Sequence, residues 1–281
     1  MKLIKGLLIF FLLITIIMTI VSNKQGEETT GSDTIINSDL EPLTISCNYT
    51  REDLLEGLTA FDAEDGYITG GIIPGEFKPF TEKGVSEIDY YVYDSEDNCG
   101  RYKREVVFSD YSSPKVALSR PLVFYPKEAS DGVILNYLSG KDLLDGDVKH
   151  IKVNSSDIDY AAVGDYTISI SLINSFGDIA TYDMPVHIIK RTYGGMDIRL
   201  NESLIYIKSG TKFDPTVFVK EVEHTYTEEL VPREDWGMDI QSTVDTSKAG
   251  VYEVRYMIKK EQDAVYGSVS GVTWLTVIVA D

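Results

Sequence analysis

Residues 87–94 read EIDYYVYD, and the alternation in this stretch decides the fold. An apolar or aromatic side chain occupies every second position, which places these side chains on one face of an extended strand. The pattern recurs at 166–174 (YTISISLIN) and at 251–258 (VYEVRYMI), each time shortly after a glycine. β-Branched and aromatic residues are enriched in strands, and glycine favours the turns between them. Long helical periodicity is absent beyond the N-terminal apolar segment, so we predict an all-β protein.

The sequence repeats itself at a fixed shift, the one that carries Gly84 onto Gly164. The shift needs no gap, and it matches apolar, acidic and glycine positions. The matched pairs include Leu54 with Ile134, Leu58 with Leu138, Asp62 with Asp142, Gly66 with Gly146, Ile88 with Ile168 and Val106 with Val186. Residues 244–258, VDTSKAGVYEVRYMI, indicate a third and more divergent copy. A fixed period of this kind predicts homologous structural units.

Turn-forming residues cluster near 110–114 and near 190–195, which marks these segments as joints between units. Short strands separated by Asp-Gly and Ser-Gly turns, in units of this size, predict small β-sandwiches. We therefore predict three tandem β-sandwich domains, at residues 42–111, 112–191 and 192–281.

A known family shares these features. The segment DLLEGLTAFDAEDGYIT at 53–69, followed by KGVSEIDYYVYDSEDNCGR at 83–101, resembles the bacterial immunoglobulin-like domain of group 3, also described as a pesticidal crystal protein Ig-like domain. The second copy matches through DLLDGDVK at 142–149 and VGDYTISISLIN at 163–174, and the third mainly through 244–258. The first copy has Tyr at the last Asp of the family's D-x-x-D-G-D motif, and the third copy lacks that motif. The resemblance implies a surface-exposed sandwich used as a spacer, stalk or adhesive module.

The composition excludes several classes of function. The 281 residues carry 26 Lys and Arg against 45 Asp and Glu, a formal net charge of -19. A nucleic-acid ligand is excluded, because its binding depends on clustered cations that displace counterions from the phosphates. The three histidines, His150, His187 and His224, stand alone in the sequence and apart from any nucleophile motif. We therefore expect no enzyme.

The N-terminus differs from the rest of the chain, because a long apolar run without charges follows Lys2 and Lys5. Lysines ahead of such a run place its start in the cytoplasm and the bulk of the chain outside. We predict that residues 1–22 are a signal anchor that contacts the membrane through residues 3–22, so that the protein lies on the extracellular side of the plasma membrane. A cleaved signal peptide of a secreted protein is the alternative. Residues 23–41 lack aromatics and periodicity, which predicts a flexible tether.

The repeated acidic motif has two interpretations. Its carboxylates are Asp62, Glu64 and Asp65 in the first copy, and Asp142, Asp145 and Asp147 in the second. Several oxygen ligands in so short a segment suit Ca²⁺, the one cofactor that we consider. Alternatively, the first Asp of each motif caps a turn by accepting backbone amides, and the Asp-Gly pair forms the turn. The spacing does not match an EF-hand loop, which favours the turn.

Cys47 and Cys99 both belong to the first predicted domain, which we expect outside the cell. Two cysteines in one exported domain predict a disulfide. That bond would close a loop of about 50 residues and stabilise the fold by about 4 kcal/mol in the chain-entropy description. The alternative is two unpaired thiols, since the other two copies have no cysteine.

Aromatic side chains supply the candidates for ligand binding. Trp236 belongs to the divergent third unit, and Tyr91 lies on the opposite face of its strand from the core positions. Large amphipathic rings bind partners at low entropic cost, although strand propensity also explains a chain with 18 tyrosines.

Together these features predict a non-enzymatic bacterial cell-surface protein. Its tandem Ig-like domains would act as a stalk or as an adhesion and binding module for an unidentified protein or carbohydrate. Two alternatives remain open at this stage. One is a carbohydrate- or cell-wall-binding module of a secreted protein, and the other is the ectodomain subunit of an envelope complex.

Overall fold

The computed structural model describes residues 34–148, 150–191, 194–263 and 267–280, and it confirms the all-β class. The chain forms two compact units. Unit 1 contains the described residues up to Ile45, then Tyr49–Lys78 and Val85–Val107, and unit 2 contains Ser46–Asn48, Pro79–Gly84 and Phe108–Asp281. Within the described residues no helix is long and apolar enough to cross a bilayer. The predicted anchor at 1–22 lies outside them.

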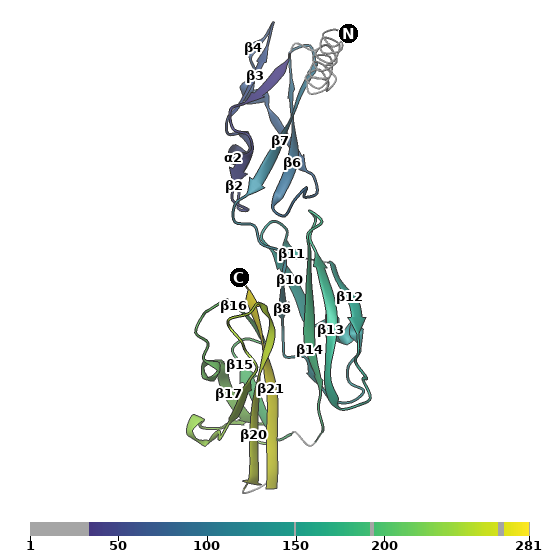
Figure 1. Ribbon diagram of the computed structural model, residues 1–281, viewed down its shortest axis with the longest axis vertical. Helices are drawn as coiled ribbons and strands as arrows, with labels where there is room; N and C mark the ends of the chain where they lie inside the picture. The colour runs from purple at the N-terminus through teal and green to yellow at the C-terminus, as the bar shows by residue number, and fades with distance from the viewer. Residues whose placement is uncertain (1–33, 149, 192–193, 264–266, 281) are drawn as a thin grey trace, which may run out of the picture. The chain divides into compact units, whose positions relative to one another are not determined.

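The described residues of unit 1 form two sheets (Figure 1). The three-stranded sheet has the order β1-β3-β4, and its strands are β1 (Ile35–Ser38), β3 (Leu58–Asp62) and β4 (Gly66–Tyr67). The four-stranded sheet has the order β2-β7-β6-β5, and its strands are β2 (Leu43–Ile45), β5 (Ile73–Phe77), β6 (Val85–Tyr93) and β7 (Cys99–Phe108). A short helix α2 (Arg51–Leu55) and a 3-10 turn η1 (Thr69–Gly71) connect the strands.

One strand of unit 1 lies where the sequence predicted a tether. β1 occupies Ile35–Ser38, inside the predicted tether at 23–41, and pairs with β3. Ile36 is buried there. The prediction of a flexible segment up to residue 41 is therefore wrong at residues 35–38, because Ile35 and Ile36 are adjacent and give no alternation that would predict a strand.

The described residues of unit 2 form four sheets. Its first pair has the orders β11-β10-β8 and β12-β13-β14-β9, and consists of β8 (Lys115–Leu118), β9 (Val123–Phe124), β10 (Leu138–Asp142), β11 (Gly146–Val148), β12 (His150–Ser156), β13 (Gly164–Ile173) and β14 (Ile179–Ile188). Its second pair has the orders β15-β17-β18 and β16-β21-β20-β19, and consists of β15 (Met196–Leu200), β16 (Leu204–Lys208), β17 (Val219–His224), β18 (Glu229–Leu230), β19 (Asp239–Ser242), β20 (Gly250–Asp263) and β21 (Gly267–Ala280). The helix α3 (Asp131–Leu135) and the 3-10 turns η2 (Pro215–Val217) and η3 (Arg233–Asp235) complete it.

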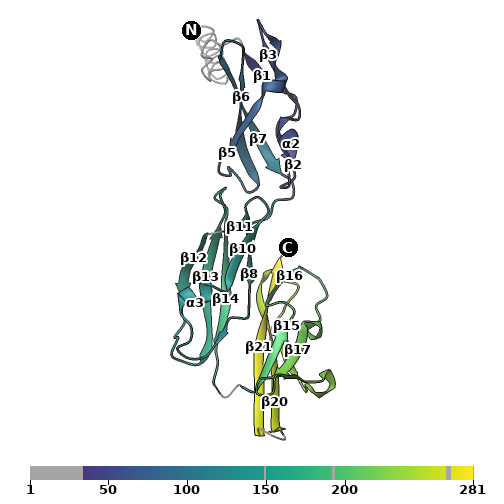
Figure 2. The same ribbon diagram turned by 180° about the vertical axis from the view of Figure 1, so that it is seen from behind.

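The sheet orders repeat along the chain. β1-β3-β4 recurs as β8-β10-β11 and again as β15-β17-β18. The four-stranded order recurs in the same way, and in both examples in unit 2 the strand that comes first in the sequence pairs in parallel, β9 with β14 and β16 with β21. Figure 2 shows the β20–β21 hairpin from behind, with β15 lying next to β21. The repeat seen in the sequence is thus also a repeat of topology.

The predicted alternation forms the core. Ile168, Ile170 and Leu172 on β13 are fully buried and belong to one cluster with Val116 on β8 and Leu138 on β10. Because β13 and β8 belong to different sheets, the two sheets enclose a shared apolar layer, as in a β-sandwich. In the last part of unit 2 a second cluster joins strands of two sheets in the same way, and it includes Ile198, Val222, Val254, Tyr256 and Leu275.

Candidate functional site

The acidic motif caps a turn in both copies. In unit 1 one oxygen of Asp62 accepts the backbone N–H groups of Glu64 and Asp65, at 2.8 and 3.0 Å. In unit 2 Asp142 accepts those of Leu144 and Asp145, at 2.9 and 3.0 Å. The bonds from Asp65 and Glu64 hold the pKa of Asp62 below its usual value.

The second Asp of the motif ties this turn to the other sheet. Asp65 accepts the backbone N–H and the hydroxyl of Ser95, at 2.6 and 2.8 Å, and Ser95 lies between β6 and β7. Asp145 accepts the same two groups from Ser175, both at 2.6 Å. The last carboxylate, Asp147, pairs with Lys141 at the surface. The described residues contain no group of three or more His, Cys, Asp or Glu side chains placed to hold a metal ion.

The two cysteines are free thiols. Cys99 is the first residue of β7, whereas the backbone N–H of Cys47 bonds Asp110, just beyond the last residue of β7. A strand of the length of β7 spans about 30 Å, and a disulfide needs Cα atoms within about 7 Å. The predicted disulfide is therefore wrong: the sequence shows that both cysteines belong to one copy, but not at which end of it each one lies.

The two predicted binding aromatics are engaged locally. Trp236 is half-buried, donates its indole N–H to the carbonyl of Val231 at 2.9 Å and lies under the guanidinium of Arg233. It packs against the core of the last sheet pair. Tyr91 is also half-buried, and Arg101 lies 5.8 Å from its ring centroid. Neither residue lines the groove described next.

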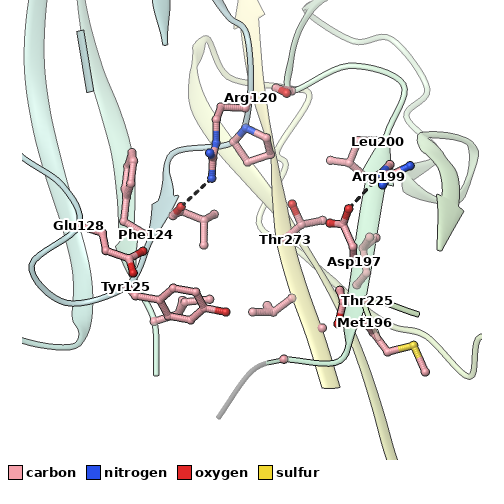
Figure 3. Close-up of a pocket in the computed structure, with 18 of the residues that line it drawn as sticks. Arg120, Phe124, Tyr125, Glu128, Met196, Asp197, Arg199, Leu200, Thr225 and Thr273 are labelled. Carbon is pink, nitrogen blue, oxygen red and sulfur yellow. Dashed lines mark hydrogen bonds and ion pairs between the residues drawn. The ribbon is translucent and has the colours of Figure 1, made fainter. Parts of the chain in front are cut away.

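A groove of about 970 Å³ opens in unit 2. Figure 3 shows Arg120 and Tyr125 on one side of it and Met196 and Asp197 on the other, with Thr273 between them. The first side comes from the segment around β9, and the second comes from β15 and β21. The walls combine aromatic rings, charged groups and backbone, which is the composition of a site for a polar ligand with an apolar face.

Arg120 is an exposed cation that lines the groove. Its guanidinium lies 4.9 Å from the ring centroid of Tyr137 and 5.9 Å from that of Phe124. One N–H reaches the carbonyl of Val123 at 3.4 Å, and within the described part of the chain Arg120 forms no ion pair. A guanidinium held over aromatic rings keeps its outer donors available for ligand oxygens.

The opposite wall is charged, and carboxylates surround its arginine. Arg199 donates to Asp197 at 3.0 Å and to Glu221 at 3.1 Å, and its second terminal nitrogen lies 3.0 Å from Glu223. These bonds occupy its guanidinium. The two arginines therefore differ: Arg199 belongs to the structure of β15 and β17, whereas Arg120 is free to bind a ligand.

Sequence reasoning missed the environment of His187, which was predicted to stand alone. Its ring lies between two carboxylates, those of Asp165 and Glu253. The repeat carried a signal, because Val85 and Val107 hold the positions of Asp165 and His187 in the first copy and also face each other across two strands. A charged pair in place of an apolar one marks a difference between the copies.

Comparison with known proteins gives a sequence relative but no family. The chain matches no protein-family model. It is 28% identical over 213 residues to the pesticidal crystal protein Cry22Aa of Bacillus thuringiensis, a match that covers 72% of this chain. The chain spans only 27% of the length of that relative. The relative is a pesticidal crystal protein, the kind of protein for which the resembled Ig-like domain is also named.

Solved structures were matched at low scores. One contains the CBM51-2 domain, in complex with GlcNAc, and INT domains of Clostridium perfringens ZmpB, with a TM-score of 0.23 and 21% identity over 53% of this chain and 26% of the other. Another is the protocadherin GammaB4 extracellular domain, with a TM-score of 0.22 and 10% identity over 89% of this chain and 51% of the other. Scores this low carry no functional argument, so function is argued from the site.

Proposed function

We propose that this chain is a non-enzymatic bacterial surface protein of three tandem Ig-like β-sandwiches that binds a carbohydrate in the groove of unit 2. The recurrence of one pair of sheet orders supports the threefold division. The observation that carries the binding function is the guanidinium of Arg120, which lies over the rings of Tyr137 and Phe124 and forms no ion pair within the described residues.

A carbohydrate suits this chemistry best. Sugar rings present hydroxyl oxygens that accept hydrogen bonds from a guanidinium, and they also present an apolar C–H face that packs on aromatic rings. Tyr125 and Tyr226 line the same groove and add such faces. The net charge of -19 disfavours polyanionic ligands at a distance, which points to a neutral glycan.

Binding of purified full-length chain to a glycan array, followed by calorimetric titration of a bound glycan, tests the proposal. Arg120→Ala removes hydrogen bonds from a charged donor, worth about 1.5–3 kcal/mol, so we expect Kd to rise about tenfold or more. The matched control is Arg233→Ala, because Arg233 also stacks on an aromatic ring but does not line the groove.

The two variants also separate the groove from the site predicted at Trp236. A loss of affinity confined to Arg120→Ala supports the groove. A loss confined to Arg233→Ala would move the site to Trp236, and an array without any bound glycan would reject the carbohydrate proposal.

The cellular place of the protein is part of the same proposal. We place the sandwiches on the extracellular side of the plasma membrane, anchored through residues 3–22. Fractionation of native cells with mass spectrometry of the N-terminus tests this. The intact apolar segment in the membrane pellet supports an anchored stalk. A shortened chain in the medium would favour a secreted binding module, and co-fractionation in a stable assembly would favour an envelope-complex subunit.

A further inference from the structure

A buried histidine in unit 2 bridges two carboxylates. His187 lies on β14 with only 5% of its side chain exposed. Its Nδ1 is 2.7 Å from Oδ1 of Asp165, and its Nε2 is 2.7 Å from Oε1 of Glu253. The ring stacks on Trp274, with centroids 4.0 Å apart and planes 12° from parallel. Both nitrogens and one face of the ring are thus engaged.

The partners of the ring come from two different sheet pairs. Asp165 stands opposite His187 in the β13–β14 register, so this contact lies within one sheet. Glu253 is on β20 and Trp274 is on β21, which belong to the last sheet pair. His187 therefore connects the second and third repeats within unit 2. A hollow of about 510 Å³ opens beside it and gives solvent a route to the ring.

Hydrogen-bond counting fixes the protonation state of the closed bridge. A neutral imidazole has one N–H donor and one acceptor nitrogen, whereas an ionised carboxylate only accepts. If both carboxylates accept a hydrogen bond from the ring, both ring nitrogens must carry a hydrogen. A neutral ring carries only one, so the closed bridge holds one additional proton. Asp165 has an 85% exposed side chain, so the extra proton belongs to His187 or to its contact with Glu253.

Two further charged groups face the ring from the same hollow. They are Lys190, which follows β14, and Arg255 on β20. The guanidinium carbon of Arg255 lies 5.8 Å from the ring centroid of Trp274, and one of its nitrogens contacts Sδ of Met257. Within the described residues neither cation forms an ion pair with the two carboxylates.

These groups act on the ring in opposite directions. Burial opposes the positive charge of His187, but the hydrogen bonds and charges of Glu253 and Asp165 together outweigh burial, and the pKa of His187 is raised above 6.5. The first copy holds Val85 and Val107 at the positions of Asp165 and His187. The sandwich itself therefore does not require the charged pair.

We propose that His187 is a proton-operated latch that fixes the second and third repeats of unit 2 against each other. When the ring is protonated, it donates to Asp165 and to Glu253 at once. When the proton leaves, one nitrogen presents a lone pair to a carboxylate, and that contact becomes repulsive. Because the pKa is higher in the closed state, the stabilisation is present at low pH and is lost as the pH rises through that pKa. This inference does not depend on the proposed carbohydrate function.

NMR of the full chain labelled with ¹⁵N-histidine tests the protonation directly between pH 5 and pH 10. We expect both ring nitrogens of His187 to carry hydrogen at neutral pH, with a midpoint above 6.5, and the His187→Gln variant assigns the signals. The exposed His150 gives a reference in the same spectrum. Glu253→Gln should lower the midpoint, while Asp183→Asn, which removes an exposed carboxylate from β14, should leave it unchanged.

A distance measurement tests the mechanical part. Spin labels at Lys152→Cys on β12 and Lys208→Cys on β16, in a chain with Cys47→Ser and Cys99→Ser, report the separation of the two repeats. We expect a narrow distance distribution below the midpoint of His187 and a broader one above it. In Glu253→Gln the distribution should no longer broaden above the midpoint, because the glutamine amide can accept from the protonated ring and donate to the neutral one. In the native chain, a midpoint at or below 6.5, or a distribution that does not change with pH, would overturn the proposal.

Discussion

Replacing Asp142 with alanine tests whether the acidic motif acts as a turn cap. One oxygen of Asp142 accepts the N–H groups of Leu144 and Asp145, and the other accepts the amide of Asn174 at 3.2 Å. Asp142 is only 8% exposed, so water cannot fully replace the lost acceptor. At about 1.5 kcal/mol for each bond to a charged group, the loss of two backbone bonds lowers the free energy of unfolding by about 3 kcal/mol. That loss corresponds to about 6–12 °C in Tm.

Scanning calorimetry of the full chain, in EDTA and again in calcium, measures this change. The matched control is Asp147→Ala, which removes an exposed carboxylate of the same motif that pairs with Lys141 at the surface. We expect less than about 0.5 kcal/mol for the control. The effect of Asp142→Ala should be the same with and without calcium. The turn-cap reasoning is refuted if the variant unfolds like the native chain in EDTA and differs from it only when calcium is present.

Two further predictions concern titratable groups. Burial, reinforced by Asp110, raises the pKa of Cys47 to about 12, so a thiol reagent at pH 8 should modify Cys99 rapidly and Cys47 only after denaturation; equal rates for both would contradict this. The lowered pKa of Asp62 arises from the backbone bonds of its turn, so its contribution to stability is present above about pH 3.9 and is lost as the pH falls through the folded-state pKa. Acid unfolding followed by circular dichroism should therefore depend less on pH in Asp62→Asn, and identical curves would argue against the cap.

The sequence predicted those strands in which apolar and polar residues alternate over a long segment. The alternation at 87–94 and 166–174 forms β6 and β13, and the fixed shift between the copies anticipates the recurrence of the sheet orders. β1 was missed because its two isoleucines become a strand only by pairing with β3, which lies further along the chain beyond β2 and α2. Arg104 shows the same limit. Its side chain is fully buried, and its guanidinium donates hydrogen bonds to the carbonyls of Leu40 and Glu56. Both partners are distant from Arg104 in the sequence, so the sequence pattern does not reveal them.

The candidate site was less predictable than the fold. Arg120 and Asp197 lie in different repeats, and neither belongs to a motif, so only the folded chain brings them to one groove. The predicted binding residue Trp236 is instead held by Val231 and by the nearby core. The role of the acidic motif was easier to predict, because its first Asp accepts backbone N–H groups that lie only two and three positions further along the chain.

Hydrogen exchange of the full chain with and without a bound glycan tests the central claim most directly. The account predicts that binding slows exchange at residues 119–128 and 196–200, the two walls of the groove. It also predicts that the segment around Trp236 exchanges at the same rate in both states. Protection around Trp236 with no change at either wall would contradict the assignment of the binding site.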